Sequence, residues 1–367
     1  MKLFWLLPID KRAIAFVSYG GSQYSDSPKY IFQALESDKR LKFIWILDDS
    51  AKLTYDGGAD VKVVKPNSFS AAKAFLTSQV IVSNTYMSAY ISFRKKQLYI
   101  NTWHGGGAFK KVGKADEKES FYNLFFNALH ASMVSVFVSS SKYFTSEVLV
   151  KSFGFHGRVL ECGLPRNDAL FQTNHDSIIR KVRERYGAPP EAGILLYAPT
   201  YRRERRENDE LDFALCVRAC EERFGKPFVC FYRSHYITGA TDVGSKAVNV
   251  TDYDDMQELL IASDALITDY SSCMWDYFLT GKPVFLFTPD VDYYQANRGF
   301  YIDIAQWPCS YAKTNAALQS HIRGFDESAY RENVKKFLEL TGSYERGNAV
   351  SAVCDCIYER LPQETTR

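Results

Sequence analysis

The sequence predicts an α/β protein with two doubly wound parallel sheets. Short apolar runs rich in Val, Ile and aromatic residues alternate with helical stretches, and several runs are continuously apolar, which is typical of strands buried on both faces. The alternation restarts once along the 367 residues, a length sufficient for two separate cores. Strands that alternate with helices imply parallel sheets covered by helices on both sides.

The predicted strands form two sets. The first set comprises residues 13–18, 43–47, 61–64, 80–83, 98–102 and 134–139, and the second comprises 194–198, 228–232, 247–250, 265–268 and 284–287. A polar passage at 172–191 separates the sets and contains Gly187 and two prolines. We therefore expect domains at 1–174 and 175–342. A terminal helix within 343–367 is expected to pack back toward the first domain, because Val350, Val353 and Ile357 recur at helical spacing.

Charge is unevenly distributed along the chain. Residues 1–172 carry 22 Lys and Arg against 14 Asp and Glu, a net +8, whereas the remainder carries 23 against 29, a net −6. A basic first half indicates either an anionic partner, such as a phosphate-rich substrate, a membrane surface or nucleic acid, or simply a solvated surface.

Composition excludes several classes. The eight cysteines lack disulfide-type or zinc-type spacing, so buried free thiols in a reducing cytoplasm are expected. No run reaches about 18 apolar residues, and the apolar stretch near the N-terminus is too short for a signal peptide. We predict no membrane span, no metal site and no cofactor.

In the first domain, the motif NTWHGGGAFKKVG follows the strand at 98–102. A neutral His104 could accept a proton from a hydroxyl, and Gly105, Gly106 and Gly107 would let the backbone approach phosphate oxygens. The alternative is a tight glycine turn with a capping histidine.

A second motif of the first domain, GLPRND, contains Arg166. This arginine is either a phosphate ligand or the ion-pair partner of Asp168. The loop at 18–25, with sequence SYGGSQYS, lacks GxGxxG spacing and either lines an acceptor site or turns the chain.

Three motifs of the second domain also follow strands. Each motif contains cationic or hydroxyl groups that suit a phosphate ligand. The alternative interpretation of each is structural, as a turn or a helix cap. The predicted ligands are Pro199, Thr200 and Arg202 in YAPTYR, Arg233, Ser234 and His235 in RSHY, and Asp269, Ser271 and Ser272 at the start of the helix in TDYSS.

Together these motifs carry a family likeness. In the order TWHGGGAFKKVG, GLPRND, YAPTYR, RSHY, ITDYSSCMWDYFLTGKPVFLF and RGFYID, the chain resembles the CDP-glycerol glycerophosphotransferases, which prime and polymerise teichoic-acid-type poly(alditol phosphate) chains. The early GGSQYSDSPKYIFQAL is also similar to that family. The resemblance spans roughly residues 13–302 and implies a GT-B fold, two Rossmann-like domains facing a cleft.

The resemblance also implies roles. The second domain would hold a CDP-alditol donor and the first would present the acceptor hydroxyl. His104 would be the general base and His235 would contact the pyrophosphate. The remaining positions that match donor ligands of the family are Arg166, Thr200, Arg233, Ser271 and Ser272. At Gly106-Gly107-Ala108 the chain departs from the usual Thr-Pro of the family, so the alditol or acceptor could differ from glycerol.

The implied function is transfer of glycerol phosphate or ribitol phosphate to a lipid-linked or polymer acceptor, with release of CMP, in teichoic-acid-like or capsular polymer synthesis. The expected location is the cytoplasm, at the inner face of the membrane. Residues 121–137, preceded by lysines, form either a peripheral amphipathic helix or a core helix. Three other readings are a GT-B nucleotide-sugar glycosyltransferase, a nucleotide-sugar 2-epimerase and a polyanion binder. Nucleic acid is not expected as a partner, because no recognition module is present.

Overall fold

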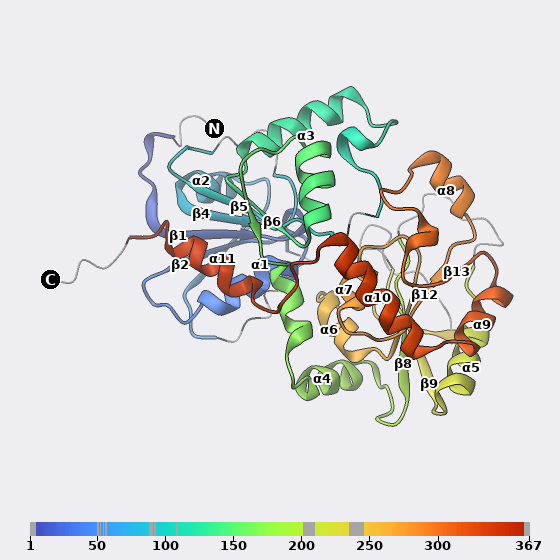
Figure 1. Cartoon of the computed structure of the whole chain (residues 1–367). Coiled ribbons are helices and arrows are strands. Elements are labelled where there is room, and N and C mark those ends of the chain that lie inside the picture. Colours follow the sequence, from blue (N-terminus) through green and yellow to red (C-terminus); the bar gives the residue numbers. More distant parts are fainter. Residues whose placement is uncertain are drawn as a thin grey trace. The chain divides into compact units, whose positions relative to one another are not determined.

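A computed structural model describes residues 5–49, 51, 53, 55, 57–87, 91, 93–107, 109–200, 210–234 and 246–362 (Figure 1). The chain divides into two compact units. Unit 1 comprises Met1–Gly106, Val112–Ala169 and Ser343–Arg367, and unit 2 comprises Gly107–Lys111 and Leu170–Gly342. The main boundary thus lies five residues before the predicted one, and the short segment Gly107–Lys111 belongs to unit 2.

Unit 1 is built on a seven-stranded sheet with strand order β3-β2-β1-β4-β5-β6-β7, and every neighbouring pair is parallel. Its strands are β1 (Asp10–Val17), β2 (Lys42–Ile46), β3 (Val61–Val64), β4 (Ser78–Ser83), β5 (Leu98–Asn101), β6 (Val136–Ser139) and β7 (Arg158–Glu161). All six predicted strands are present. The edge strand β7 was not predicted, because its RVLE sequence has charged, exposed ends in place of an apolar run.

Helices cover the sheet of unit 1. They are α1 (Asp26–Leu35), α2 (Phe69–Thr77), α3 (Phe121–Met133) and α11 (Ala349–Tyr358), with a π-helical segment at Phe144–Ser152. Helices α1 and α11 pack together, and Phe32 and Ile357 from them join Phe16 and Trp45 in one buried cluster. The terminal helix is therefore part of the core of unit 1.

Unit 2 is built on a six-stranded sheet with strand order β10-β9-β8-β11-β12-β13, again parallel throughout. Its strands are β8 (Gly193–Tyr197), β9 (Phe228–Tyr232), β10 (Val248–Asn249), β11 (Ala265–Thr268), β12 (Val284–Phe287) and β13 (Tyr311–Ala312). Its helices are α4 (Asp176–Tyr186), α5 (Phe213–Phe224), α6 (Met256–Ala262), α7 (Cys273–Phe278), α8 (Val291–Asn297), α9 (Asn315–Arg323) and α10 (Glu327–Thr341). Only the two-residue edge strand β13 was not predicted.

Each sheet has a point where the strand order reverses. In unit 1 it lies between β1 and β4, and in unit 2 between β8 and β11. Loops that leave the carboxyl ends of strands diverge at such a point, and ligands of doubly wound sheets bind there. The loops after these four strands are therefore the first places to look for a site.

The eight cysteines are all free thiols, and seven of them are buried. Burial raises the pKa of every one of these thiols, to about 12 for the partly exposed Cys162. The sequence-based prediction of buried free thiols is thus confirmed for these seven, and raised pKa values are typical of unreactive structural cysteines.

Candidate active site

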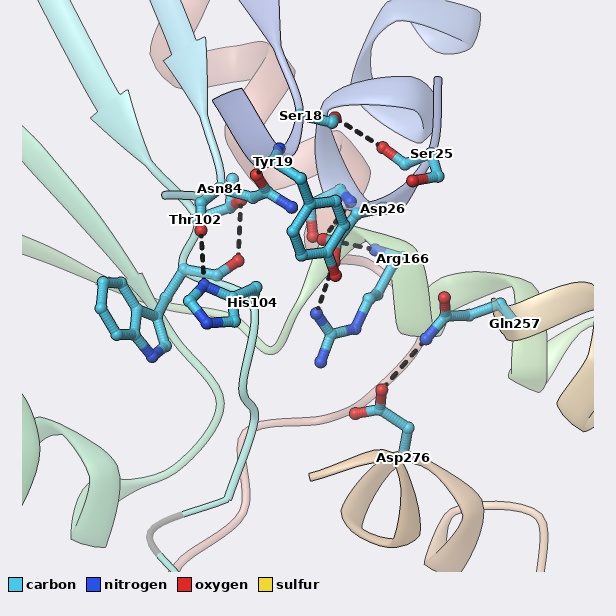
Figure 2. A network of polar contacts seen from close by, with 12 residues as sticks. Ser18, Tyr19, Ser25, Asp26, Asn84, Thr102, His104, Arg166, Gln257 and Asp276 are labelled. Carbon is cyan, nitrogen blue, oxygen red and sulfur yellow. Dashed lines mark hydrogen bonds and ion pairs between the residues drawn. The ribbon is translucent and has the colours of Figure 1, made fainter. Parts of the chain in front are cut away.

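His104 lies just beyond β5, and its ring is oriented by a backbone carbonyl. Its Nδ1 is 3.0 Å from the carbonyl oxygen of Asn84, which follows the neighbouring strand β4 (Figure 2). A carbonyl oxygen only accepts hydrogen bonds, so in the neutral ring Nδ1 carries the proton and Nε2 carries the lone pair. This tautomer is the one a general base needs.

Asn84 is a further candidate site residue, one that the sequence reasoning did not single out. It is fully buried, and its Oδ1 accepts a 2.8 Å hydrogen bond from the backbone N–H of Tyr19 in the loop after β1. Its Nδ2 is buried and has no hydrogen-bond partner among the described residues. A buried donor of this kind is costly unless a ligand or water accepts from it. Its place directly after a strand was the available signal.

A second set of contacts in unit 1 surrounds Asp26, the first residue of α1. Its Oδ2 accepts from the Tyr19 hydroxyl at 2.7 Å and from Nη1 of Arg166 at 2.9 Å (Figure 2). The Asp26 and Arg166 side chains are each only 4% exposed, so this is a buried ion pair. The Tyr19 ring also packs edge-on to the His104 ring, 5.9 Å between centroids. Tyr19 thus connects the ion pair to the histidine.

Strained backbone is concentrated around these side chains. Positive φ values occur at Tyr19 (47°), Asp26 (60°) and Trp103 (54°), three of the four non-glycine cases among the described residues. Such conformations cost free energy and cluster at functional sites. The loop after β1 is closed by the Ser18 hydroxyl, which donates to the Ser25 carbonyl at 2.7 Å. The observed strain makes this end of the sheet a candidate functional site.

Of the two alternatives for Arg166, the ion pair with Asp168 is wrong. Arg166 pairs with Asp26, while the Asp168 carboxylate accepts from the backbone N–H groups of Ala349 and Val350 at 3.1 and 2.7 Å. Asp168 therefore caps the start of α11. Asp26 lies 140 residues from Arg166 along the chain, so sequence spacing gave no sign of this contact.

The corresponding end of the unit 2 sheet is organised by Asp269, which follows β11 and is 1% exposed. Its carboxylate accepts from the backbone N–H of Thr200 at 2.9 and 3.0 Å, from the Thr200 hydroxyl at 3.0 Å and from the Tyr270 N–H at 2.5 Å. These bonds tie the loop after β8, including buried Pro199, to the loop after β11. Asp269 and Thr200 thus hold each other in place.

Arg233 and Ser234 follow β9 in unit 2. The Arg233 guanidinium contacts Sδ of Met256 at 2.9 Å and the Asp254 carbonyl at 3.3 Å, at the start of α6. Ser234 is buried, and its N–H donates to the Thr251 hydroxyl at 2.9 Å. Two further predicted ligands, Arg202 and His235, lie outside the described residues.

Ser272 stands at the N-cap position of α7, but its hydroxyl makes no capping hydrogen bond. The plain capping role considered from sequence is therefore not what this hydroxyl does. Ser271 precedes it, and both serines are partly exposed. Within α7, Asp276 is 2% exposed and accepts from Nε2 of Gln257 at 3.0 Å (Figure 2).

The three glycines after His104 have different surroundings. The Gly106 carbonyl accepts from the Ser140 hydroxyl in unit 1, and Gly105 is partly buried. A Cβ on Gly107 would lie 2.6 Å from ring carbons of both Phe109 and Trp275 in unit 2. Packing alone explains why Gly107 has no side chain.

The next residues join unit 2. Lys110 forms a β-bridge with Phe300, and the Lys111 N–H donates to the Gly299 carbonyl at 3.2 Å. The chain therefore leaves unit 1 three residues after His104 and is fastened to the RGFYID segment of unit 2.

The family model for CDP-glycerol:poly(glycerophosphate) glycerophosphotransferases matches residues 1–359. The chain belongs to this family. The resemblance found in the motifs is thereby confirmed.

Three relatives support the assignment. The chain is 29% identical to a teichoic acid poly(glycerol phosphate) polymerase of Staphylococcus epidermidis, over 97% of this chain and 52% of that protein. It is 28% identical to a protein of the same name from Bacillus spizizenii, over 96% of this chain and 94% of that protein. It also superposes on a structure of the wall teichoic acid polymerase TagF with a TM-score of 0.84 and 28% identity, covering 97% of this chain and 92% of that one.

These matches confirm the predicted GT-B-like class of two parallel-sheet α/β domains. The chain spans about half the length of the Staphylococcus epidermidis relative. Among the residues that the structure describes, no three or more His, Cys, Asp or Glu side chains gather as metal ligands would.

Proposed function

We propose that this protein transfers an alditol phosphate, glycerol phosphate or ribitol phosphate, from a CDP-alditol to a hydroxyl of a lipid-linked or polymer acceptor. CMP is the second product, and the polymer is teichoic-acid-like or capsular. Membership of the family supports the reaction class, and the names of the two relatives above favour glycerol phosphate.

The observation that carries the mechanism is the hydrogen bond from Nδ1 of His104 to the Asn84 carbonyl. With Nδ1 protonated, Nε2 takes the proton of the acceptor hydroxyl as its oxygen bonds to the phosphorus that carries the alditol. The bond from that phosphorus to the bridging oxygen breaks, and CMP leaves with the electron pair. Assistance by a positioned base contributes about 10²–10⁴-fold to the rate.

The donor pyrophosphate is assigned to the switch point of unit 2. Arg233 provides a permanent positive charge, and Ser271 and Ser272 provide hydroxyls at the start of α7. Thr200 acts mainly through Asp269, which fixes the loop after β8. His235 and Arg202 are proposed as further phosphate ligands, on the family motifs alone. Arg166 is proposed to act from unit 1, held by Asp26.

The test is CMP release from CDP-glycerol and CDP-ribitol, with and without a lipid-linked acceptor, compared with UDP- and GDP-sugars. We expect His104→Gln to lower acceptor-dependent CMP release about 10²–10⁴-fold while donor binding is retained. His156→Gln is the matched control, since His156 is an exposed histidine of unit 1. Turnover of His104→Gln within a few-fold of the parent would show that His104 is not the base. Turnover of a nucleotide sugar but of neither CDP-alditol would favour a glycosyltransferase.

We also propose a peripheral contact with an anionic membrane through α3. Phe121, Tyr122 and Phe125 in the first turns of this helix are 85%, 68% and 57% exposed. A core helix would bury these rings, and large exposed aromatics on a helix that follows lysine-rich sequence suit a membrane interface. No helix of the described chain is long and apolar enough to span a membrane.

Vesicle flotation tests this contact. We expect the protein to float with vesicles containing anionic lipid at low salt, and Phe121→Ser/Phe125→Ser to reduce the bound fraction at least several-fold. Phe69→Ser is the control, because Phe69 is 86% exposed on α2 of the same unit. Equal loss in the control, or no flotation of the parent protein, would refute a role for α3.

A further inference from the structure

Unit 1 contains a cavity of about 340 Å³ that the motif analysis did not anticipate. It lies at the carboxyl end of the sheet, where Val17 ends β1 and Ile46 ends β2. The far wall comes from α2, and Met87 and Ile91 complete the lining beyond β4. The volume falls within the range of about 300–1,000 Å³ typical of small-molecule sites.

The described residues that line the cavity carry no charged side chain. None of the twelve described residues that line it is acidic or basic, and most are aliphatic or aromatic, including Ala71, Ala72 and Phe75. A phosphate group placed here would lose its hydration without gaining a cationic partner. The described walls therefore favour an uncharged ligand with a hydrocarbon part over CDP-alditol or anionic polymer.

Polar groups contribute little to the lining of the cavity. The Tyr86 hydroxyl is buried and has no hydrogen-bond partner among the described residues, while its ring lines the cavity. Asn67, also in the lining, has a φ of 55°, the fourth non-glycine residue with positive φ among those described. Asn67 is exposed and the Tyr86 hydroxyl has no accessible surface, so the cavity offers a ligand mainly its apolar walls.

Two sets of contacts connect lining residues of the cavity to His104. The Tyr86 ring lies 5.0 Å from the Trp103 ring, which in turn lies 4.6 Å from the His104 ring. On the other side, Gly20 of the lining follows Tyr19, whose ring packs against His104. A ligand that fills the cavity would thus hold its remaining part near the proposed base.

We propose that this cavity binds an uncharged, hydrocarbon-bearing group of the acceptor and so presents the acceptor hydroxyl to His104. The inference deepens the function proposed above and rests on it for the identity of the ligand as an acceptor. The existence of an apolar binding site in unit 1 does not depend on that function.

Calorimetry with n-alkyl β-D-glucosides, butyl to decyl, below their micelle concentrations tests the site directly. Because each buried methylene contributes about 0.8 kcal/mol, affinity should rise roughly three- to fourfold per methylene until the cavity is full, and glucose alone should not bind. An octyl sulfate of the same chain length should bind at least tenfold more weakly than octyl glucoside.

Two variants place the binding in this cavity. Ala72→Phe should fill the space and weaken octyl glucoside binding at least tenfold, whereas Lys73→Phe, on the exposed side of the same helix, should not. Met87→Ala should enlarge the cavity, so that affinity continues to rise to a longer alkyl chain than in the parent protein. This second variant keeps the test decisive if Ala72→Phe does not fold.

The outcomes separate the two proposals. Both the proposed function and the cavity proposal would be supported by three results for Ala72→Phe. These are loss of glucoside binding, a raised KM for the acceptor and unchanged CMP release from CDP-glycerol in the absence of acceptor. Ala72-dependent binding without transfer from any CDP-alditol would refute the proposed function and leave the cavity as an apolar site. Binding that is unaffected by Ala72→Phe, or that is lost only in Phe121→Ser/Phe125→Ser, would overturn the cavity proposal.

Discussion

The buried ion pair of Asp26 and Arg166 makes a quantitative prediction. In Asp26→Asn, the guanidinium of Arg166 stays buried, with a neutral amide in place of the carboxylate 2.9 Å away. Breaking a buried pair by removing one partner typically costs about 3–5 kcal/mol of unfolding free energy. Asparagine has the same shape and tolerates the φ of 60° found here, so backbone strain adds little to the loss.

Asp10→Asn is the matched control. Asp10 pairs with Lys42 in the same unit at 2.7 Å, but its side chain is 37% exposed and that of Lys42 is 55% exposed. An exposed pair contributes about 0–1 kcal/mol, so the same substitution should cost several-fold less here. The double variant Asp26→Asn/Arg166→Met should recover much of the loss, because no buried charge is left behind.

Hydrogen exchange measured by mass spectrometry is the appropriate assay, because it resolves the stability of unit 1 from that of unit 2. We expect faster exchange in β1 and β4 of Asp26→Asn and unchanged exchange in the unit 2 sheet. An effect of Asp26→Asn no larger than that of Asp10→Asn would refute the reasoning. Because Tyr19 joins this pair to His104, reduced transferase turnover should accompany the loss.

Three further predictions concern other parts of the chain. Burial lowers the pKa of His130, whose two ring nitrogens are buried and have no hydrogen-bond partner among the described residues. On acidification the unfolded chain therefore binds a proton at this histidine before the folded protein does, so the free energy of unfolding should be highest above about pH 6.5 and fall below it. His130→Phe should flatten that part of a denaturation-versus-pH curve. Gly107→Ala should cost about 1–3 kcal/mol in thermal or urea unfolding, since the new methyl group would crowd Phe109 and Trp275; no loss would contradict the packing account of this glycine. The raised thiol pKa values predict that a thiol reagent at pH 8 labels the folded protein slowly, Cys162 first, and all eight thiols rapidly in denaturant; fast labelling of several thiols in the native protein would count against the described burial.

Much of this protein could be determined from its sequence alone. The strands at 61–64, 228–232, 265–268 and 284–287 were predicted with the bounds that the structure has. The last three are almost fully buried and apolar throughout, so the local sequence indicates them directly, whereas 61–64 is a partly exposed edge strand that includes Lys62. The position of His104 after a strand was visible for the same reason, and the order of motifs identified the family.

Contacts between residues far apart in the sequence required the tertiary structure. Three contacts join segments at least 69 residues apart. They are the ion pair of Arg166 with Asp26, the hydrogen bonds of Asp269 to Thr200 and the capping of α11 by Asp168. The sequence shows that a charged side chain needs a partner if it is buried, but only the fold determines which oppositely charged group lies close enough to pair with it. The tautomer of His104 is set in the same way, by the carbonyl of Asn84, which follows a neighbouring strand. The sequence by itself named the residues and the family, and only the tertiary structure decided which groups meet.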